Sequence, residues 1–404
     1  MAWTLRTFSS DVLDVDAARL EELAADEDAL EALEVDVVRG GEPVRITHVL
    51  DAVEPRIRPD GRAAFPLEPK AGQGVTHRID QAVVLPCLDF PGEERPLHEQ
   101  ESIVDLAGPG SGLTPFTIGT NVVLTFHGRP DAGHRAIDSS TRRVTLAAAE
   151  LLAAPTLEAE PDREETFELG PADESLPSIA ALVQLSDLGQ LYQLYVYGEP
   201  AGEVGLPRVV DPAEMLDGAV TAGEYHWAAM RNPTLFFQRN SLVTTLYREH
   251  GKRLRFAGVV FMRGYEQSAA DKQRAADEAA HVAAEVGADG AVITTDGGGN
   301  SHTDVMLTCR ACESAGIRTA VVLAEETDLD ATEAILTDWV PEADCIVSTG
   351  NLEELVPAWR PERVLGGDAL LDGTPAADVA PIPVRNYLGA ANQMGQLCAG
   401  AMSW

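Results

Sequence analysis

The order of apolar and polar residues divides this chain of 404 residues into two parts with different expected structures. From residue 255 onward, short apolar runs alternate with helix-length segments over short connections. Such runs are typical of strands buried on both faces of a parallel sheet. The expected strands are residues 255–262, 290–295, 317–324 and 344–349, and the expected helices are residues 267–286, 303–315 and 331–340. This β-α-β alternation predicts a Rossmann-like, doubly wound parallel sheet.

The amino-terminal part is expected to be β-rich. Its candidate strands mix β-branched and aromatic residues and are bounded by Gly, Pro and Asp; they are residues 44–53, 78–88, 121–128 and 191–198. Leucines spaced among acids predict one helix over residues 16–33. The acidic, proline-containing stretch 154–177 predicts a long loop. We therefore expect an α/β protein with a β-rich domain over residues 1–230 and a Rossmann-like domain over residues 231–404.

Composition narrows the class of protein. The formal net charge of −35 would repel phosphate backbones, so nucleic-acid binding is not expected. No apolar run approaches the roughly 20 residues that span a bilayer, and the first residues do not form a secretory signal, which together predict a cytoplasmic protein. The five cysteines are scattered, so neither a disulfide framework nor a metal site is expected, and Cys309 and Cys312 are interpreted as packing residues on a helix.

The loops that follow the expected parallel strands carry candidate ligand-binding residues, because ligands of open parallel sheets gather at the carboxyl ends of the strands. These candidates are Gly297, Gly298, Gly299, Asn300, His302, Asp304, Glu325, Thr349, Gly350 and Asn351. Glycines and the amides at a helix start would suit a carboxylate or a phosphate. A tight turn without any ligand explains the same glycines equally well. Neither the GxGxxG nor the GxxxxGK[ST] pattern is present, so no nucleotide cofactor is expected.

The pair Asn240–Ser241 lies between an aromatic run and the start of an expected helix. The simpler interpretation is a helix cap, in which a serine ahead of the helix accepts a hydrogen bond from a backbone amide. The alternative is self-cleavage, in which the hydroxyl attacks the preceding carbonyl and the ester then eliminates to leave a pyruvoyl group. That chemistry requires a base and an oxyanion donor. His250 and His226 are the candidate bases, and Gln238 and Asn240 the candidate donors.

Long segments of the sequence carry a resemblance to a known family. They are RNPTLFFQRNSLVTTLYREHGKRLRFAGVVF (231–261), GADGAVITTDGGGNSHTDVMLTCRACESAGIRTAVVLAEET (287–327) and CIVSTGN (345–351), with weaker similarity at 46–57, 196–198 and 388–395. The chain resembles the alpha/beta precursor subunit of component B of glycine, sarcosine and betaine reductases, which is related to the pyruvoyl subunit of D-proline reductase. Processed members carry cysteine at the cut, where this chain has Ser241.

The resemblance implies a pyruvoyl cofactor made from the chain itself and a hetero-oligomer with a partner subunit that bears cysteine or selenocysteine. It implies an oxidoreductase subunit that cleaves the C–N bond of glycine, sarcosine, betaine or a related amine. A second hypothesis is an unprocessed scaffold or ligand-binding subunit that presents the substrate to the partner's thiol or selenol. The two hypotheses differ in what happens at Ser241.

Overall fold

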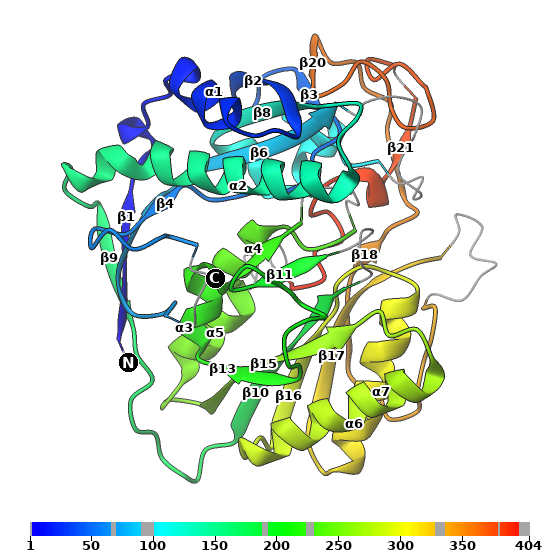
Figure 1. The fold of residues 1–404 in the computed structure, drawn as a ribbon. Helices are drawn as coiled ribbons and strands as arrows, with labels where there is room; N and C mark the ends of the chain where they lie inside the picture. Colours follow the sequence, from blue (N-terminus) through cyan, green and yellow to red (C-terminus); the bar gives the residue numbers. More distant parts are fainter. Residues whose placement is uncertain are drawn as a thin grey trace.

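The computed structural model describes residues 2–65, 70–89, 101–187, 193–223, 230–327, 336–378 and 380–395. They form a mixed α/β fold built from several sheets, with helices packed against the two larger groups of strands (Figure 1). The expected α/β class is confirmed at this level.

The largest sheet has six strands in the order β13-β15-β10-β16-β17-β18. Its strands are β10 (Ser178–Ser186), β13 (Arg208–Val210), β15 (Arg255–Gly264), β16 (Gly290–Thr294), β17 (Arg318–Glu325) and β18 (Ile346–Asn351). All neighbours pair in parallel except β13, which is antiparallel to β15. The four strands expected from residue 255 onward are therefore confirmed, whereas the central position of β10 was not expected.

Alternation along β10 explains why it takes the central position. Ala180 and Leu182 face α6 (Ala269–Glu285) and α7 (Asn300–Ser314), which lie along one face of the sheet (Figure 1). Ala181 and Val183 face the opposite side and join the core cluster that includes α5 (Ser241–Glu249). A strand that is apolar on both faces needs cover on both faces, which only an interior position provides.

The proposed domain boundary near residue 230 stays a prediction. Strands β10 and β13, which precede it in sequence, hydrogen-bond to strands that follow it.

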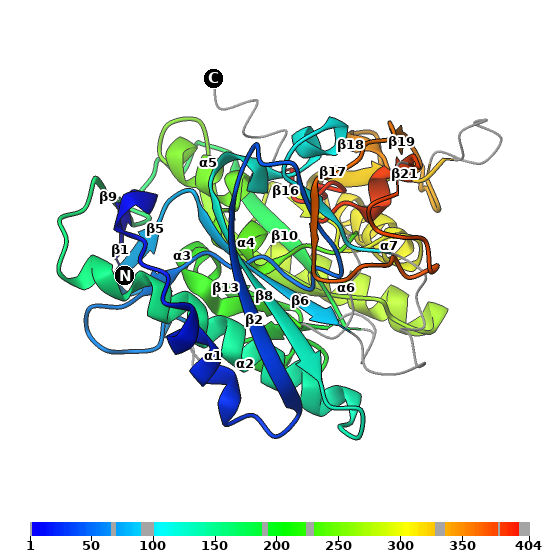
Figure 2. The same ribbon diagram turned by 90° about the horizontal axis from the view of Figure 1, so that it is seen from above.

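The smaller sheets come from the remainder of the chain. One sheet has the order β4-β5-β1-β9 and another β2-β8-β6, and α1 and α2 cover one face of the latter (Figure 2). These elements are β1 (Trp3–Phe8), α1 (Ala17–Ala25), β2 (Leu30–Arg39), β4 (Arg56–Ile57), β5 (Gly74–Ile79), β6 (Ala82–Asp89), β8 (Thr120–Gly128), α2 (His134–Ala153) and β9 (Arg163–Phe167).

Short strands complete the fold in three further sheets, β20-β3-β7, β12-β11-β14 and β19-β21. Their bounds are β3 (Val44–Ile46), β7 (Val104–Asp105), β11 (Leu194–Val196), β12 (Glu199–Pro200), β14 (Val220–Ala222), β19 (Leu355–Val356), β20 (Arg363–Leu365) and β21 (Ile382–Pro383). The remaining helices are α3 (Pro212–Glu214) and α4 (Thr234–Gln238).

Several expectations about the elements need correction. The strand expected over residues 44–53 ends at Ile46, and the one expected over 78–88 is divided between β5 and β6. The helix expected over residues 16–33 ends at Ala25, because Leu30 and Leu33 lie on β2, whose pairing with β8 outweighs local helical preference. The loop expected over 154–177 contains β9, which pairs antiparallel with β1. The helix expected over 331–340 lies partly outside the described residues, and its described part, 336–340, is irregular.

A buried ion cluster joins the amino-terminal part to the end of α4. Glu54 is completely buried and accepts hydrogen bonds from Arg56 Nε at 2.7 Å and from Arg239 Nε, while Arg78 Nη1 lies 3.7 Å away. The amino-terminal segment that contains Glu54 and Arg56 also binds Gln238. The Oε1 of Gln238 accepts from the Glu54 amide at 3.0 Å, and its carbonyl oxygen accepts from Arg56 Nη2 at 3.1 Å. These bonds fix the end of α4 immediately before Asn240.

Replacing this carboxylate should destabilise the protein strongly. Burial alone would raise the pKa of Glu54, but Arg239, Arg56 and Arg78 outweigh it and lower the pKa to about 2. The stabilisation is therefore complete above the ordinary pKa of 4.5 and is lost as the pH falls toward about 2. We expect Glu54→Gln to lower the free energy of unfolding at pH 7 by about 3–5 kcal/mol, because it leaves buried guanidinium groups uncompensated.

Urea unfolding followed by circular dichroism measures this change. The matched control is Glu164→Gln, which removes an exposed pair with Arg6 and should change stability by less than about 1 kcal/mol. Equal effects of the two substitutions would contradict a special role for the buried cluster.

Candidate functional site

The pair Asn240–Ser241 begins α5 in a regular capping geometry. Asn240 is the N-cap, and its Oδ1 accepts a hydrogen bond from the Val243 amide at 2.9 Å. Its backbone angles, φ −61° and ψ 110°, are ordinary for this position. A helix cap is therefore present, but the capping side chain is Asn240, and Ser241 is the first helical residue.

The carbonyl of Asn240 has two donors from one residue. The Thr244 amide lies 3.0 Å and the Thr244 hydroxyl 2.8 Å from this oxygen. Sequence reasoning missed Thr244, although its position four residues after Asn240 places it one helical turn away. Two donors on this oxygen are the arrangement that would stabilise negative charge if the carbonyl carbon were attacked.

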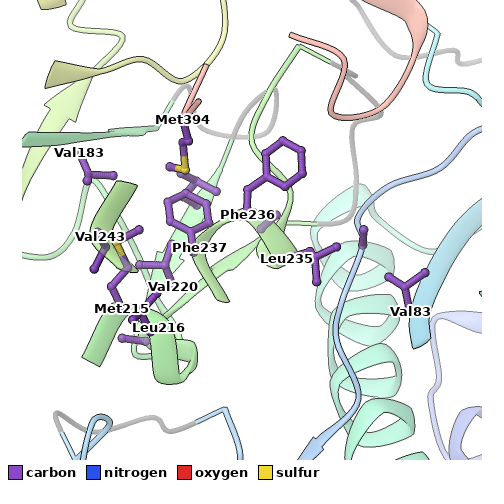
Figure 3. Close-up of a cluster of buried hydrophobic side chains, with 14 of the residues drawn as sticks. Val83, Val183, Met215, Leu216, Val220, Leu235, Phe236, Phe237, Val243 and Met394 are labelled. Carbon is purple, nitrogen blue, oxygen red and sulfur yellow. The ribbon is translucent and has the colours of Figure 1, made fainter. Parts of the chain in front are cut away.

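The carboxyl-terminal segment passes beside the same turn. Ser241 Oγ lies 3.4 Å from the carbonyl oxygen of Gly395, and Asn240 Nδ2 lies 3.4 Å from Met394 Sδ. Met394 belongs to the core cluster beneath α4 and α5, where it lies near Phe237 (Figure 3). Residues 240–241 and 394–395 thus meet only through the tertiary fold, so their spacing in the sequence gave no sign of these contacts.

The structure does not bring His250 to Ser241. His250 caps the opposite end of α5, about 13 Å along the helix axis from residue 241 at about 1.5 Å per residue. Its Nδ1 accepts from the Phe256 amide at 2.9 Å, and its Nε2 lies 2.8 Å from the Gly170 carbonyl oxygen. Both ring nitrogens therefore contact backbone groups outside α5, at Phe256 and Gly170, and neither faces the Asn240–Ser241 turn. His226, the other candidate base, lies outside the described residues.

Gln238 is buried beside the cap but does not contact the Asn240 carbonyl through any recorded bond. Because its Oε1 accepts from the Glu54 amide, the other terminal atom must be the amide nitrogen. That nitrogen, Nε2, is buried and has no hydrogen-bond partner among the residues that the structure describes. An unsatisfied buried donor is uncommon and costs free energy unless a ligand or water completes it.

The glycine loop after β16 binds a carboxylate that belongs to the chain itself. The Gly299 amide donates to both oxygens of Glu326, at 3.1 and 3.2 Å, at the start of α7. A Cβ on Gly298 would lie 1.9 Å from Glu326 Oε1, so only glycine permits this approach. Gly297, at φ +84°, passes close to Tyr265 in the same way. The expected anion position is thus filled from within.

Two other candidates near this loop, Asp304 and Asn300, form hydrogen bonds with other residues of the chain. Asp304 accepts from Lys272 Nζ at 2.7 Å and from the Tyr265 amide at 2.8 Å, while Asn300 Nδ2 reaches the Glu266 carbonyl at 3.4 Å. These bonds fix the start of α7 against α6. They leave no free polar group on Asp304 that would need a ligand.

His302 differs, because it is completely buried and neither ring nitrogen has a hydrogen-bond partner within the described part of the chain. Its Nδ1 lies 4.0 Å from Glu326 Oε2. Burial lowers the pKa of His302, and the nearby carboxylate of Glu326 opposes that effect only in part. The imidazole is therefore neutral at pH 7.

The candidates at the ends of β17 and β18 also contact one another or nearby backbone. Glu325 Oε1 accepts from Ser348 Oγ at 2.6 Å, and Asn351 Nδ2 reaches the Thr327 carbonyl at 3.2 Å. Thr349 Oγ1 donates to the Ala391 carbonyl at 2.6 Å, which ties the carboxyl-terminal segment to β18. Gly350, at φ +117°, allows the strand end to turn.

A buried acid at the end of β16 was not among the candidates. Asp296 Oδ1 accepts from the Asn232 amide at 2.7 Å and from Asn232 Nδ2 at 3.0 Å, whereas its Oδ2 has no partner. Burial raises the pKa of Asp296. Its place as the first residue of the glycine loop was the available signal.

Cysteine and metal chemistry have little support here. Cys309 and Cys312 are both buried, and burial raises the pKa of the Cys312 thiol to about 12, as expected of packing residues. Cys398 lies outside the described residues. Within the described ranges, no three His, Cys, Asp or Glu side chains are grouped so that they could hold a metal ion. The helices of the described part include none with the length and apolar character needed to cross a bilayer.

Comparison with known proteins gives a consistent result. Residues 3–378 match the family described as glycine/sarcosine/betaine reductase component B subunits. The sarcosine reductase complex component B subunit alpha of Peptoclostridium acidaminophilum is 30% identical over 97% of this chain and 90% of that protein. The glycine reductase complex component B subunits alpha and beta of Acetoanaerobium sticklandii are 30% identical over 86% of this chain and 81% of that protein.

A more distant relative is the D-proline reductase proprotein PrdA of Acetoanaerobium sticklandii, which is 25% identical over 72% of this chain and 46% of that protein. No solved structure shows significant similarity to the chain.

His302 should make stability depend on pH. Because its pKa is lowered on folding, the unfolded chain takes up a proton near pH 6.5 that the folded chain does not bind. The free energy of unfolding should therefore fall as the pH drops below about 6.5, and this part of the fall should be absent in His302→Leu. Urea unfolding at pH 7.5, 6.5 and 5.5 measures it.

The control is His281→Gln, which removes an exposed imidazole from α6 and should keep the wild-type slope. An unchanged slope in His302→Leu would show that the buried imidazole does not carry the pH dependence.

Proposed function

Because the chain belongs to the family of glycine/sarcosine/betaine reductase component B subunits, we propose that it is an oxidoreductase subunit acting on the C–N bond of glycine, sarcosine, betaine or a related amine. In this proposal it works in a hetero-oligomer with a cysteine- or selenocysteine-bearing partner. The reaction takes place at the turn between α4 and α5, beside the carboxyl-terminal edge of the Rossmann-like sheet.

The observation that carries the proposal is that the Asn240 carbonyl oxygen accepts two hydrogen bonds. Both hydrogen bonds come from Thr244, one from its amide and one from its hydroxyl. The next residue after Asn240 is Ser241, whose hydroxyl is the proposed nucleophile. Attack by Ser241 Oγ on this carbonyl carbon would place negative charge on an oxygen that already has two donors. The relatives' names agree with processing, since one sequence is named for two subunits and another is named a proprotein.

Self-cleavage then follows in balanced steps. Ser241 Oγ bonds to the Asn240 carbonyl carbon, the C–N bond breaks, and the hydroxyl proton passes to the freed amine. Loss of the Cα proton of residue 241 expels the Asn240 carboxylate and leaves dehydroalanine, which water converts to the ketone with release of ammonia. The buried ion cluster at Glu54 holds the end of α4 during these steps, because it binds Gln238 and Arg239 directly.

A pyruvoyl group at residue 241 supplies a ketone electrophile that no standard side chain provides. The residues present suit it, since it would form at the amino end of α5 beside the Asn240 turn. The chain's own contribution is to orient the carbonyl through Thr244 and to cover the site with residues 394–395.

A second candidate is an unprocessed subunit that presents substrate to its partner. The relaxed capping geometry of Asn240 favours it, because the backbone angles store no strain that cleavage would release. The unprocessed subunit is also favoured by His250, because its ring contacts Gly170 and Phe256 at the far end of α5 and not Ser241. The two candidates differ only in the covalent state of residue 241.

Intact-mass spectrometry of the purified protein decides between them. We expect wild type to give two fragments that meet at residues 240 and 241, the carboxyl-terminal fragment being resistant to Edman degradation. Ser241→Ala should remain one chain because it has no nucleophile. Thr244→Val should slow cleavage by about tenfold to a thousandfold, as is usual when an oxyanion donor is removed.

The sequence offers a matched control. Asn300–Ser301 is a second Asn–Ser pair at a helix start, so Ser301→Ala should leave cleavage unchanged. A single unbroken wild-type chain, also in the presence of its partner subunit, would eliminate the processed form and leave the presenting subunit.

A further inference from the structure

A cavity of about 320 Å³ lies beside the Asn240 turn, since Gln238, Arg239 and Thr244 all line it. It is lined by residues from β1, β9, α4 and α5. Trp3, Phe167 and Leu216 form a buried apolar wall, with the rings of Trp3 and Phe167 stacked at 5.1 Å. The cavity therefore combines an apolar surface with the polar groups described next.

The cavity is connected to the proposed reaction site through a single side chain. Thr244 lines the cavity and donates its hydroxyl to the Asn240 carbonyl at 2.8 Å. A ligand in the cavity would therefore lie within one side chain of the Asn240–Ser241 bond.

The charge of the lining is opposite to that of the protein. The chain carries a net −35, yet four arginines and two acids line this cavity. Arg78 and Arg239 share the buried Glu54 with Arg56, so three guanidinium groups face one buried carboxylate. Asp80 offsets part of this excess by pairing with Arg239 at 2.9 Å.

Arg78 shows that the positive charge is incompletely compensated. Burial lowers the pKa of Arg78, and Arg239 and Arg56 lower it further against the opposing effect of Glu54, to about 10. A buried cation with this imbalance is stabilised by any anion that approaches it.

Gln238 adds a neutral donor to the same wall. It lines the cavity, and its Nε2 is buried without a hydrogen-bond partner because Oε1 is held by the Glu54 amide. Arg248 lies at the rim, where its exposed guanidinium is only loosely paired with Glu165 at 3.8 Å. The lining thus offers donors at its buried end and at its mouth.

We propose that this cavity binds the carboxylate of a small amino-acid-type ligand, with the ligand's methyl or methylene groups against Trp3 and Phe167. Its role in placing the substrate amine near residue 241 rests on the proposed function. Binding of the carboxylate itself does not, because every group involved is present in the uncut chain.

Glycine betaine is the appropriate probe, since its quaternary nitrogen cannot condense with a ketone. Isothermal titration of Ser241→Ala protein at low salt should show binding of betaine and of acetate. Choline has the same cationic group without a carboxylate and should bind at least about tenfold more weakly, as expected for the loss of a charge-assisted interaction.

Two substitutions that should change betaine affinity in opposite directions distinguish ligand recognition from structural damage. Arg248→Gln should weaken betaine binding by about fivefold, whereas Asp80→Asn should tighten it by about twofold to fivefold because it removes a negative charge from the wall. Arg253→Gln removes an 82% exposed arginine just beyond α5, outside the cavity lining, and should have no effect.

Binding of choline as tight as that of betaine, or equal affinities in the wild-type, Arg248→Gln and Asp80→Asn backgrounds, would overturn the carboxylate site. Betaine binding to a chain that is never cut would retain the site and reject only the processing step.

Discussion

One carboxylate, Glu54, is buried among three guanidinium groups, and this cluster fixes the end of α4 directly before the proposed reaction site. Glu54 and Arg56 come from the amino-terminal part, and Gln238 and Arg239 from the end of α4. Because an uncompensated buried charge is strongly unfavourable, these four residues must stay together whenever the protein is folded. The Asn240–Ser241 turn inherits its position from this cluster, as does the cavity that opens beside it.

The chain fills one carboxylate position in the fold from within, and we propose a second position for the carboxylate of a ligand. At the start of α7, Glu326 already fills the position over Gly298 and Gly299. In the cavity lined by Arg78 and Gln238, the donors exceed the acids that face them. Helix amides and glycine loops are commonly taken as ligand sites, yet here the loop amide already binds Glu326, whereas Gln238 Nε2 in the arginine cavity has no hydrogen-bond partner among the described residues.

At the Asn240–Ser241 turn, the observed capping function is compatible with the proposed reactive one. The Asn240 side chain satisfies a helix amide, while its carbonyl binds the Thr244 amide and hydroxyl. A cap of this kind holds the carbonyl in a fixed orientation, which is what an attack by the neighbouring hydroxyl requires. The same geometry is stable in an uncut chain, so the fold accommodates both the precursor and the presenting subunit.

The sequence by itself determined the parallel strands after residue 255, the packing role of Cys309 and Cys312, and a helix start at residue 241, because each depends on local apolar pattern or local backbone bonding. It also indicated that the loop at Gly298 suits a carboxylate. Only the tertiary structure decided which carboxylate fills that loop, since Glu326 reaches it from the next strand.

Tertiary structure likewise placed β10 in the centre of the sheet, separated His250 from Ser241 by the length of a helix, and turned residues 30–33 into strand. These outcomes depend on pairing and burial between segments far apart in the chain. A local pattern holds no information about the partner in such contacts, and the partner supplies the energy that decides them.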